Sequence, residues 1–143
     1  MPVSDISTAR DELLTFFRTS WNAQVPSVKV IYDDRKQNIP DTAVPWLRVM
    51  VRHNFGFQAT LSGEFGQRRF QNNGIITIQI FTPFGDGLVL NDQYVQIIKT
   101  IFQGNETTPD GIIFRNVRSN EIGEDGPWFN TNILIEFEYS EVK

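Results

Sequence analysis

Side chains with catalytic potential are few along this chain of 143 residues. Its single histidine is His53, and acid–base or nucleophilic catalysis needs a base that converges with an orienting acid and a nucleophile. No serine–acid pair accompanies His53 at a recognisable spacing. The absence of cysteine from the sequence excludes disulfides, thiolate nucleophiles and thiolate metal sites. We therefore expect no enzymatic activity and no catalytic residues.

The acidic and glycine-rich segments do not match a metal or cofactor site either. Asp33-Asp34 and Glu124-Asp125 are adjacent pairs in polar segments, whereas a cation site needs more oxygen ligands at defined spacing. The segment Phe84-Gly-Asp-Gly87 lacks the longer glycine spacing and the Lys-Ser/Thr pair of a phosphate-binding loop. We expect solvated turns at the two acidic pairs and a strand-to-helix turn at Phe84–Gly87, with no metal and no cofactor.

Arg68-Arg69 is a local basic cluster at the tip of the segment before the central strand. It either pairs with an acidic surface on a neighbouring protein or keeps a loop tip soluble. The formal net charge of −4 and the pI of about 4.9 do not favour a nucleic-acid groove or a membrane surface, both of which need basic patches. The N-terminal residues lack the features of a signal peptide, and no apolar run is long enough for a membrane helix. We expect a protein that is made in the cytoplasm.

A strand followed directly by a helix forms the expected centre of the fold. Residues 74–82 combine β-branched and aromatic side chains, with Ile76, Ile78 and Ile80 on one face, and they predict a central strand. Pro83 ends this strand because it cannot donate to a sheet ladder. Asp86 is well placed to cap the following helix, whose apolar positions run from Leu90 to Phe102 at helical spacing: Leu90, Tyr94, Ile97, Ile98, Ile101 and Phe102.

The remaining elements predict a single α+β domain over residues 1–143. A helix is expected from Ser4 to Trp21, with an apolar stripe that includes Ile6, Ala9, Leu13 and Phe17. Alternating or β-branched runs predict strands at 28–32, 46–53, 111–118 and 128–139, and residues 121–127 predict a turn. This order favours a mostly antiparallel sheet with two helices packed on one face.

Residues 46–82 predict a long two-stranded β-hairpin. At about 3.3 Å per residue such a hairpin could project beyond the domain core. A projecting arm exposes apolar area and strand edges, which favours a partner subunit; the alternative is a hairpin that folds back over the sheet. From this argument alone we nominate four interface residues on the arm: Phe57, Glu64, Arg68 and Arg69.

The order of these features resembles the tail terminator (tail completion) family of long-tailed bacteriophages. The N-terminal part of the resemblance is a helix ending in Phe16-Phe17 and Trp21, then a strand and polar loop that lead into Pro45-Trp46. The central part is a long hairpin with Leu61, Gly63 and Arg69 before Gly74. The C-terminal part is a strand ending Phe81-Thr82-Pro83, the Gly85-Asp-Gly87 turn, a helix, and a last strand that closes with Ile-Glu-Phe-Glu-Tyr139.

The resemblance implies a structural virion protein in the neck region of the tail. Six copies are expected to form a ring on the last ring of the tail tube, to end tube polymerisation and to offer a surface to the head–tail connector protein. DNA is expected to pass through the lumen without specific binding. Two alternatives stay open: another neck or tail-tube component of a phage, or a small ligand-binding α+β domain, which would need a concave pocket with convergent polar groups.

Overall fold

The computed structural model describes residues 6–32, 44–58, 69–85, 88–107 and 111–142, of which residues 55–58, 69 and 141–142 are described by their backbone alone. The elements in chain order are α1 (Ile6–Asn22), β1 (Lys29–Tyr32), β2 (Trp46–Gln58), β3 (Arg69–Pro83), α2 (Val89–Phe102), β4 (Ile113–Asp125) and β5 (Trp128–Val142). Among the described residues, no helix has the length and apolar character to cross a bilayer.

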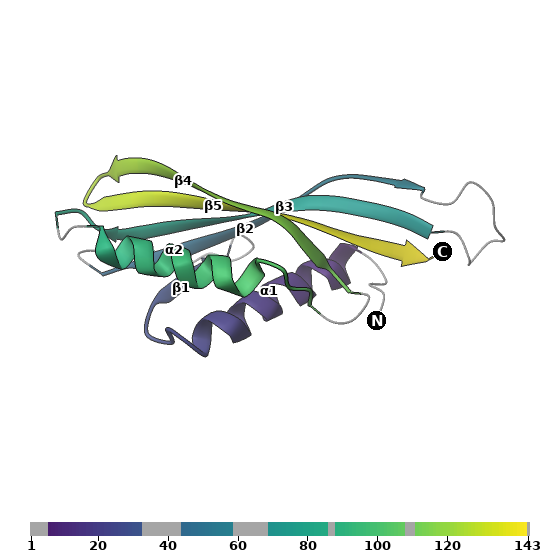
Figure 1. Ribbon diagram of the computed structural model, residues 1–143, viewed down its shortest axis with the longest axis horizontal. Helices are drawn as coiled ribbons and strands as arrows, with labels where there is room; N and C mark the ends of the chain where they lie inside the picture. Colours follow the sequence, from purple (N-terminus) through teal and green to yellow (C-terminus); the bar gives the residue numbers. More distant parts are fainter. Residues whose placement is uncertain (1–5, 33–43, 59–68, 86–87, 108–110, 143) are drawn as a thin grey trace.

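The strands form one five-stranded sheet in the order β1-β2-β3-β5-β4. β1 runs parallel to β2, and the other neighbouring strands are antiparallel. Both helices lie on the same face of the sheet (Figure 1). We call the helix-covered face the inner face and the opposite one the outer face. The predicted α+β class, with two helices on a mostly antiparallel sheet, is confirmed.

β3 is the central strand, as predicted. Ile76, Ile78 and Ile80 are fully buried on the inner face, and they oppose buried residues of β2 and β5, among them Val49 and Ile133. On the outer face of β3, Ile75, Thr77 and Gln79 are half-buried while Phe81 is buried. A side-chain period of two, with one fully covered face, accounts for both patterns.

The inner core is closed by aromatic side chains from the helices. Phe17 of α1 stacks on Phe102 of α2 at 6.0 Å between ring centroids, and Trp21 meets Tyr94 edge-on at 5.5 Å. The predicted stripe of α1 is confirmed at Ala9, Leu13 and Phe17. It is wrong at Ile6, whose side chain is 53% exposed because the first turn of α1 reaches past the core.

The start of α2 differs from the prediction. The N-cap position is Leu88, which makes no side-chain cap bond, and Asp86 lies outside the described residues. Leu90 is 37% exposed, and Asn91 is buried in its place. The Asn91 amide donates to Thr82 Oγ1 at 3.2 Å, and the Thr131 hydroxyl donates to Asn91 Oδ1 at 2.7 Å. These bonds set the rotation of α2 on the sheet and turn Leu90 outward.

β4 and β5 continue further than predicted. Residues 121–125, which we expected in a turn, continue β4 and pair with the start of β5; Gly126, with φ of 61°, and Pro127 form the connection. Acidic residues are depleted in strands, yet they are tolerated on a solvated edge strand, and β4 is an edge. Its ladder is interrupted by two register shifts, one between Phe114 and Val117 and one near Gly123.

The predicted long β2–β3 hairpin is present as a ladder from Trp46↔Phe81 to Gln58↔Phe70. The expectation of a two-stranded excursion is wrong over the described residues, because β5 pairs with β3 along its whole length, from Pro83↔Trp128 to Arg69↔Val142. The far ends of β2, β3 and β5 therefore continue together as three strands past the helices (Figure 1). Residues 59–68, between β2 and β3, lie outside the described residues.

Candidate interaction surfaces

Two of the four nominated interface residues, Phe57 and Arg69, lie at the far end of the described β2–β3 ladder. Phe57 lies in β2 opposite Gln71, and Arg69 lies in β3 opposite Val142. Glu64 and Arg68 fall outside the described residues. The register brings the backbones of Phe57 and Arg69 to the same end of the sheet. Phe57 pairs with Gln71, and Arg69 lies two residues before Gln71 in β3. Their role in an interface stays a prediction.

His53 is half-buried on the inner face, beside the core. Its ring meets Phe137 and Tyr139 edge-on, at 5.5 and 5.9 Å between centroids. Its Nε2 lies 2.9 Å from the Tyr139 hydroxyl, and its Nδ1 lies 3.5 Å from an Arg10 guanidinium nitrogen. A phenol and a guanidinium around an imidazole do not make the nucleophile–base–acid arrangement of covalent catalysis. The geometry supports a packing role for His53.

Gly74 makes the His53 contact possible. It lies in β3 directly between His53 of β2 and Phe137 of β5. A Cβ at this position would overlap the Phe137 ring and the backbone carbonyl of Arg52. The missing side chain lets rings from two strands meet above the strand that separates them.

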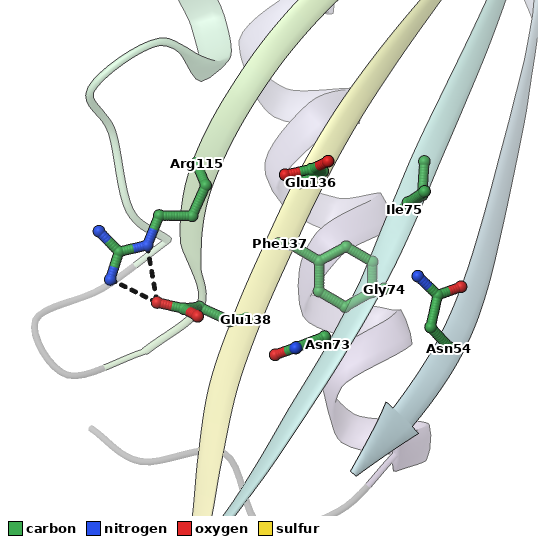
Figure 2. Close-up of a pocket in the computed structure, with 8 residues that line it drawn as sticks. All are labelled: Asn54, Asn73, Gly74, Ile75, Arg115, Glu136, Phe137 and Glu138. Atoms are coloured by element: carbon green, nitrogen blue, oxygen red, sulfur yellow. Dashed lines mark hydrogen bonds and ion pairs between the residues drawn. The ribbon is translucent and has the colours of Figure 1, made fainter.

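A polar groove of about 250 Å³ crosses the outer face of the sheet. Figure 2 shows Arg115 reaching from β4 toward Glu138 on β5, with Asn54 on the far side of β3. The groove is lined by Asn54, Asn73, Gly74, Ile75, Arg115, Glu136, Phe137 and Glu138.

The carboxylates of the groove are engaged by neighbouring strands. Glu138 accepts hydrogen bonds from Arg115 Nε at 2.7 Å and from Gln71 Nε2 at 2.8 Å, and the terminal Arg115 nitrogen also pairs with it. Glu136 accepts from Asn116 Nδ2 at 2.7 Å. The register shift in β4 turns both Arg115 and Asn116 toward this face. These are cross-strand polar contacts of a solvated sheet, each of small energetic worth, and they form no catalytic set.

The acidic pairs do not assemble a metal centre in the part of the chain that the structure describes, where no group of three potential ligands converges. Glu124 and Asp125 are exposed at the end of β4. Asp33 and Asp34 lie outside the described residues.

An exposed apolar surface lies where β3 leads into α2, and the sequence reasoning missed it. Four side chains form this turn-end surface, and Val89 is the most exposed of them at 72%: Phe84, Leu88, Val89 and Leu90. A hydrogen bond of 2.8 Å from the Phe84 amide to the Pro127 carbonyl ties it to the β4–β5 turn. Its sequence signal was the density of large apolar residues around a turn; of the four, the predicted stripe of the helix included Leu90 alone.

Comparison with known proteins agrees with the fold. The family model described as "Phage tail terminator protein" matches residues 12–137. No curated protein sequence is significantly similar to the chain. One solved structure, of a protein that carries no functional name, aligns with a TM-score of 0.66 and 20% identity, over 90% of this chain and 94% of the other. At this identity the likeness shows the shared fold alone.

Proposed function

Because the chain belongs to the phage tail terminator family, we propose that it forms a ring at the head-proximal end of the tail tube. The family is structural and non-enzymatic, and it places the chain in the virion tail in association with the tail tube. In our proposal the ring is a hexamer, which ends tube polymerisation and offers its free side to the head–tail connector protein. The observation that carries the proposal is the family match over residues 12–137.

The architecture supports a ring on physical grounds. A closed ring is built from heterologous contacts, so each subunit must present two different surfaces to its neighbours. The β2–β3 hairpin supplies one distinctive element, and we propose that its far end contacts the neighbouring subunit. Phe57, Glu64, Arg68 and Arg69 are the residues that we assign to this contact.

We further propose that DNA passes through the ring without specific binding. The chain carries a formal charge of −4, so six copies repel a polyanion rather than hold it. The outer face of the sheet mixes both signs of charge, as in the contacts of Arg115 with Glu138 and of Arg118 with Glu136. In these contacts carboxylates partly neutralise arginines that a nucleic-acid groove would leave available to phosphates.

The solution mass of the protein tests the ring. Six copies of 16.5 kDa give about 99 kDa, and light scattering followed by negative-stain imaging should show a ring of that mass, free or on tail tubes. If the ring forms on the tube alone, the free protein is smaller and added protein caps purified tubes. A protein that neither forms rings nor caps tubes would contradict the proposal, and one that extends tubes would indicate a tube component.

A further inference from the structure

We propose that the turn-end surface, formed by Phe84, Leu88, Val89 and Leu90, receives the hairpin end of a neighbouring copy of this chain. We call residues 57–69, which run from the last residues of β2 to the first residue of β3, the hairpin end. The inference rests on the proposed function, in which the hairpin end contacts a neighbouring subunit, and it names the surface that the hairpin end contacts.

The exposure of the turn-end surface favours a protein partner. Most of the large apolar side chains that are exposed in the described chain lie in this short segment, whereas Ile6, Val44 and Ile122 are scattered singly. Scattered exposure is normal for a soluble protein, but adjacent exposed apolar side chains mark interaction sites. Val89 and Phe84 are 72% and 52% exposed, so more than half of each side chain can still be buried by a partner.

Exposed carboxylates border the turn-end surface, from Asp92 in the first turn of α2 and from Glu124 and Asp125 beside the β4–β5 turn. Within the described part of the chain, none of these three carboxylates forms an ion pair, whereas Glu136 and Glu138 of the groove pair with arginines of β4. The acidic border is therefore available to a partner that carries cations. Two turn-end surfaces would repel each other, which disfavours a symmetric contact.

The hairpin end has the complementary composition. Its sequence combines the apolar side chains of Phe57, Leu61 and Phe65 with the adjacent cations Arg68 and Arg69. Two arginines and one glutamate give this segment a net charge of +1, in a chain whose formal charge is −4. Apolar side chains next to cations suit an apolar surface with an acidic border, so this chain itself supplies a matching partner.

The two surfaces cannot meet within one chain. β3 is paired with β5 from Arg69↔Val142 to Pro83↔Trp128, and at about 3.3 Å per residue the ends of β3 lie about 45 Å apart. The segment between Gln58 and Arg69 has both of its ends fixed at one end of the ladder, so about ten residues reach about 17 Å from there. A hairpin end that binds a turn-end surface therefore comes from another copy.

Each copy then offers one donor and one acceptor, at opposite ends of the sheet (Figure 1). Such a contact is heterologous, as a closed ring requires, and each copy can engage two neighbours at once. The acceptor is held in place by the buried hydrogen bonds of Asn91 to Thr82 and Thr131, and by the bond from the Phe84 amide to the Pro127 carbonyl. Anchoring of this kind lowers the entropic cost of binding.

The chain contains no cysteine, so introduced thiols can report the contact directly. Ser62→Cys places a thiol of similar size in the hairpin end, and Val89→Cys places one at an exposed position of the turn-end surface. Both substitutions are combined in one chain. The assembled protein, free or on tail tubes, is treated with a short bismaleimide and separated on a denaturing gel. The matched control combines Ser62→Cys with Thr100→Cys, an exposed position near the other end of α2.

We expect the chain with thiols at 62 and 89 to keep the mass of the unmodified assembly and to form covalent multimers of up to six chains. These multimers should be at least tenfold more abundant than in the control. An assembled ring without them would overturn the assignment and leave the ring proposal standing. Crosslinked dimers of a chain with Val89→Cys alone would show that two turn-end surfaces meet, which also overturns it. If the unmodified chain neither forms rings nor caps tubes, the proposed function fails together with this inference.

An exchange of charges tests the same contact without a crosslinker. Arg68→Glu with Arg69→Glu should raise the concentration needed for assembly at least tenfold, because it places carboxylates against the acidic border. Adding Glu124→Arg and Asp125→Arg should restore assembly, as measured by light scattering with circular dichroism as the check on folding. A failure of the added arginines to restore assembly would overturn the pairing. A Val89→Asp variant that keeps the ring but no longer caps tubes would identify the tube end as the occupant and overturn it too.

Discussion

Gly74 shows how much of the inner face depends on a single missing side chain. The residue lies in β3 between His53 and Phe137, whose rings meet edge-on. Phe137 in turn stacks on Tyr139, whose hydroxyl lies 2.9 Å from His53. Because Gly74 has no side chain, the aromatic side chains of β2 and β5 can meet across the central strand.

Gly74→Ala should destabilise the domain by about 1–3 kcal/mol, because the added methyl group overpacks a filled site. Its Cβ would overlap the Phe137 ring and the Arg52 carbonyl. Urea unfolding measures the change. Phe137→Leu, which removes the ring, serves as the second arm of a double-mutant cycle, and its effect should be smaller in the Gly74→Ala background. Full stability of Gly74→Ala would show that the strand shifts to admit the methyl group.

The stability of the fold should depend on pH through the buried phenol of Tyr94. Burial raises the pKa of its phenol above the ordinary value of 10.0, because the charged form is desolvated. Below about pH 10 the phenol is neutral in both the folded and the unfolded chain, and its full contribution to stability is present. As the pH rises from there through the folded pKa, the unfolded chain ionises first and this contribution is lost.

The free energy of unfolding, measured at about pH 9 and again at about pH 11, should therefore fall less in Tyr94→Phe than in the unmodified chain. An equal fall in the two proteins would mean that the phenol is as well solvated in the fold as in the unfolded chain.

At the scale of elements, a polar contact decides how α2 sits on the sheet. Asn91 is buried at a position where the helical period alone indicates an apolar residue, and its amide joins Thr82 of β3 to Thr131 of β5. Apolar packing at Tyr94, Ile98 and Phe102 then holds the rest of the helix. A satisfied polar group within an apolar interface selects one orientation of the helix out of several that bury similar area.

Asn91→Ala should lower the free energy of unfolding by about 2–4 kcal/mol, because it leaves two buried hydroxyl groups without the amide and also opens space in the core. Gln93→Ala, at an exposed position of the same helix, is the control and should change stability by less than about 0.5 kcal/mol. Chemical denaturation of both variants makes the comparison. Equal effects would show that helix propensity, rather than the buried contact, dominates at Asn91.

The hydrophobic periods of the sequence predicted the elements well and their ends poorly. Alternation at Leu47, Val49 and Val51, and again from Ile133 to Tyr139, identified the buried faces, since the pleat has a strict period of two. Residues 121–125 were misassigned because their side chains are polar, while pairing with β5 decides their conformation. The exposure of Leu90 follows from the rotation of α2, which depends on a contact between elements remote in sequence.

The candidate surfaces were less accessible to prediction for the same reason. Arg115 and Glu138 are 23 positions apart, and they meet because of the β4–β5 register and its interruption after Phe114. No periodicity along either strand encodes that register shift. The parallel pairing of β1 with β2 likewise has no local signal in four residues, and it depends on how α1 leads the chain onto the sheet.

At the scale of the whole molecule, assembly is predicted to depend on the hairpin between β2 and β3. Deletion of residues 63–69 should leave a folded domain that no longer assembles, because the described inner core is built from residues outside this range. Circular dichroism and light scattering separate the two effects, with the unmodified chain as the reference. A deletion variant that fails to fold would show that the segment belongs to the core and that the arm hypothesis is wrong.

The continuous pairing of β3 has a mechanical consequence for the sheet. β3 is bonded to β5 from Arg69 to Pro83 and to β2 over most of that length, so its two ends are joined through two ladders. A tensile load applied along the strands would shear many hydrogen bonds at once, whereas a load across the strands would open them one after another. The sheet is therefore strongest along the direction that joins its hairpin end to its turn-end surface.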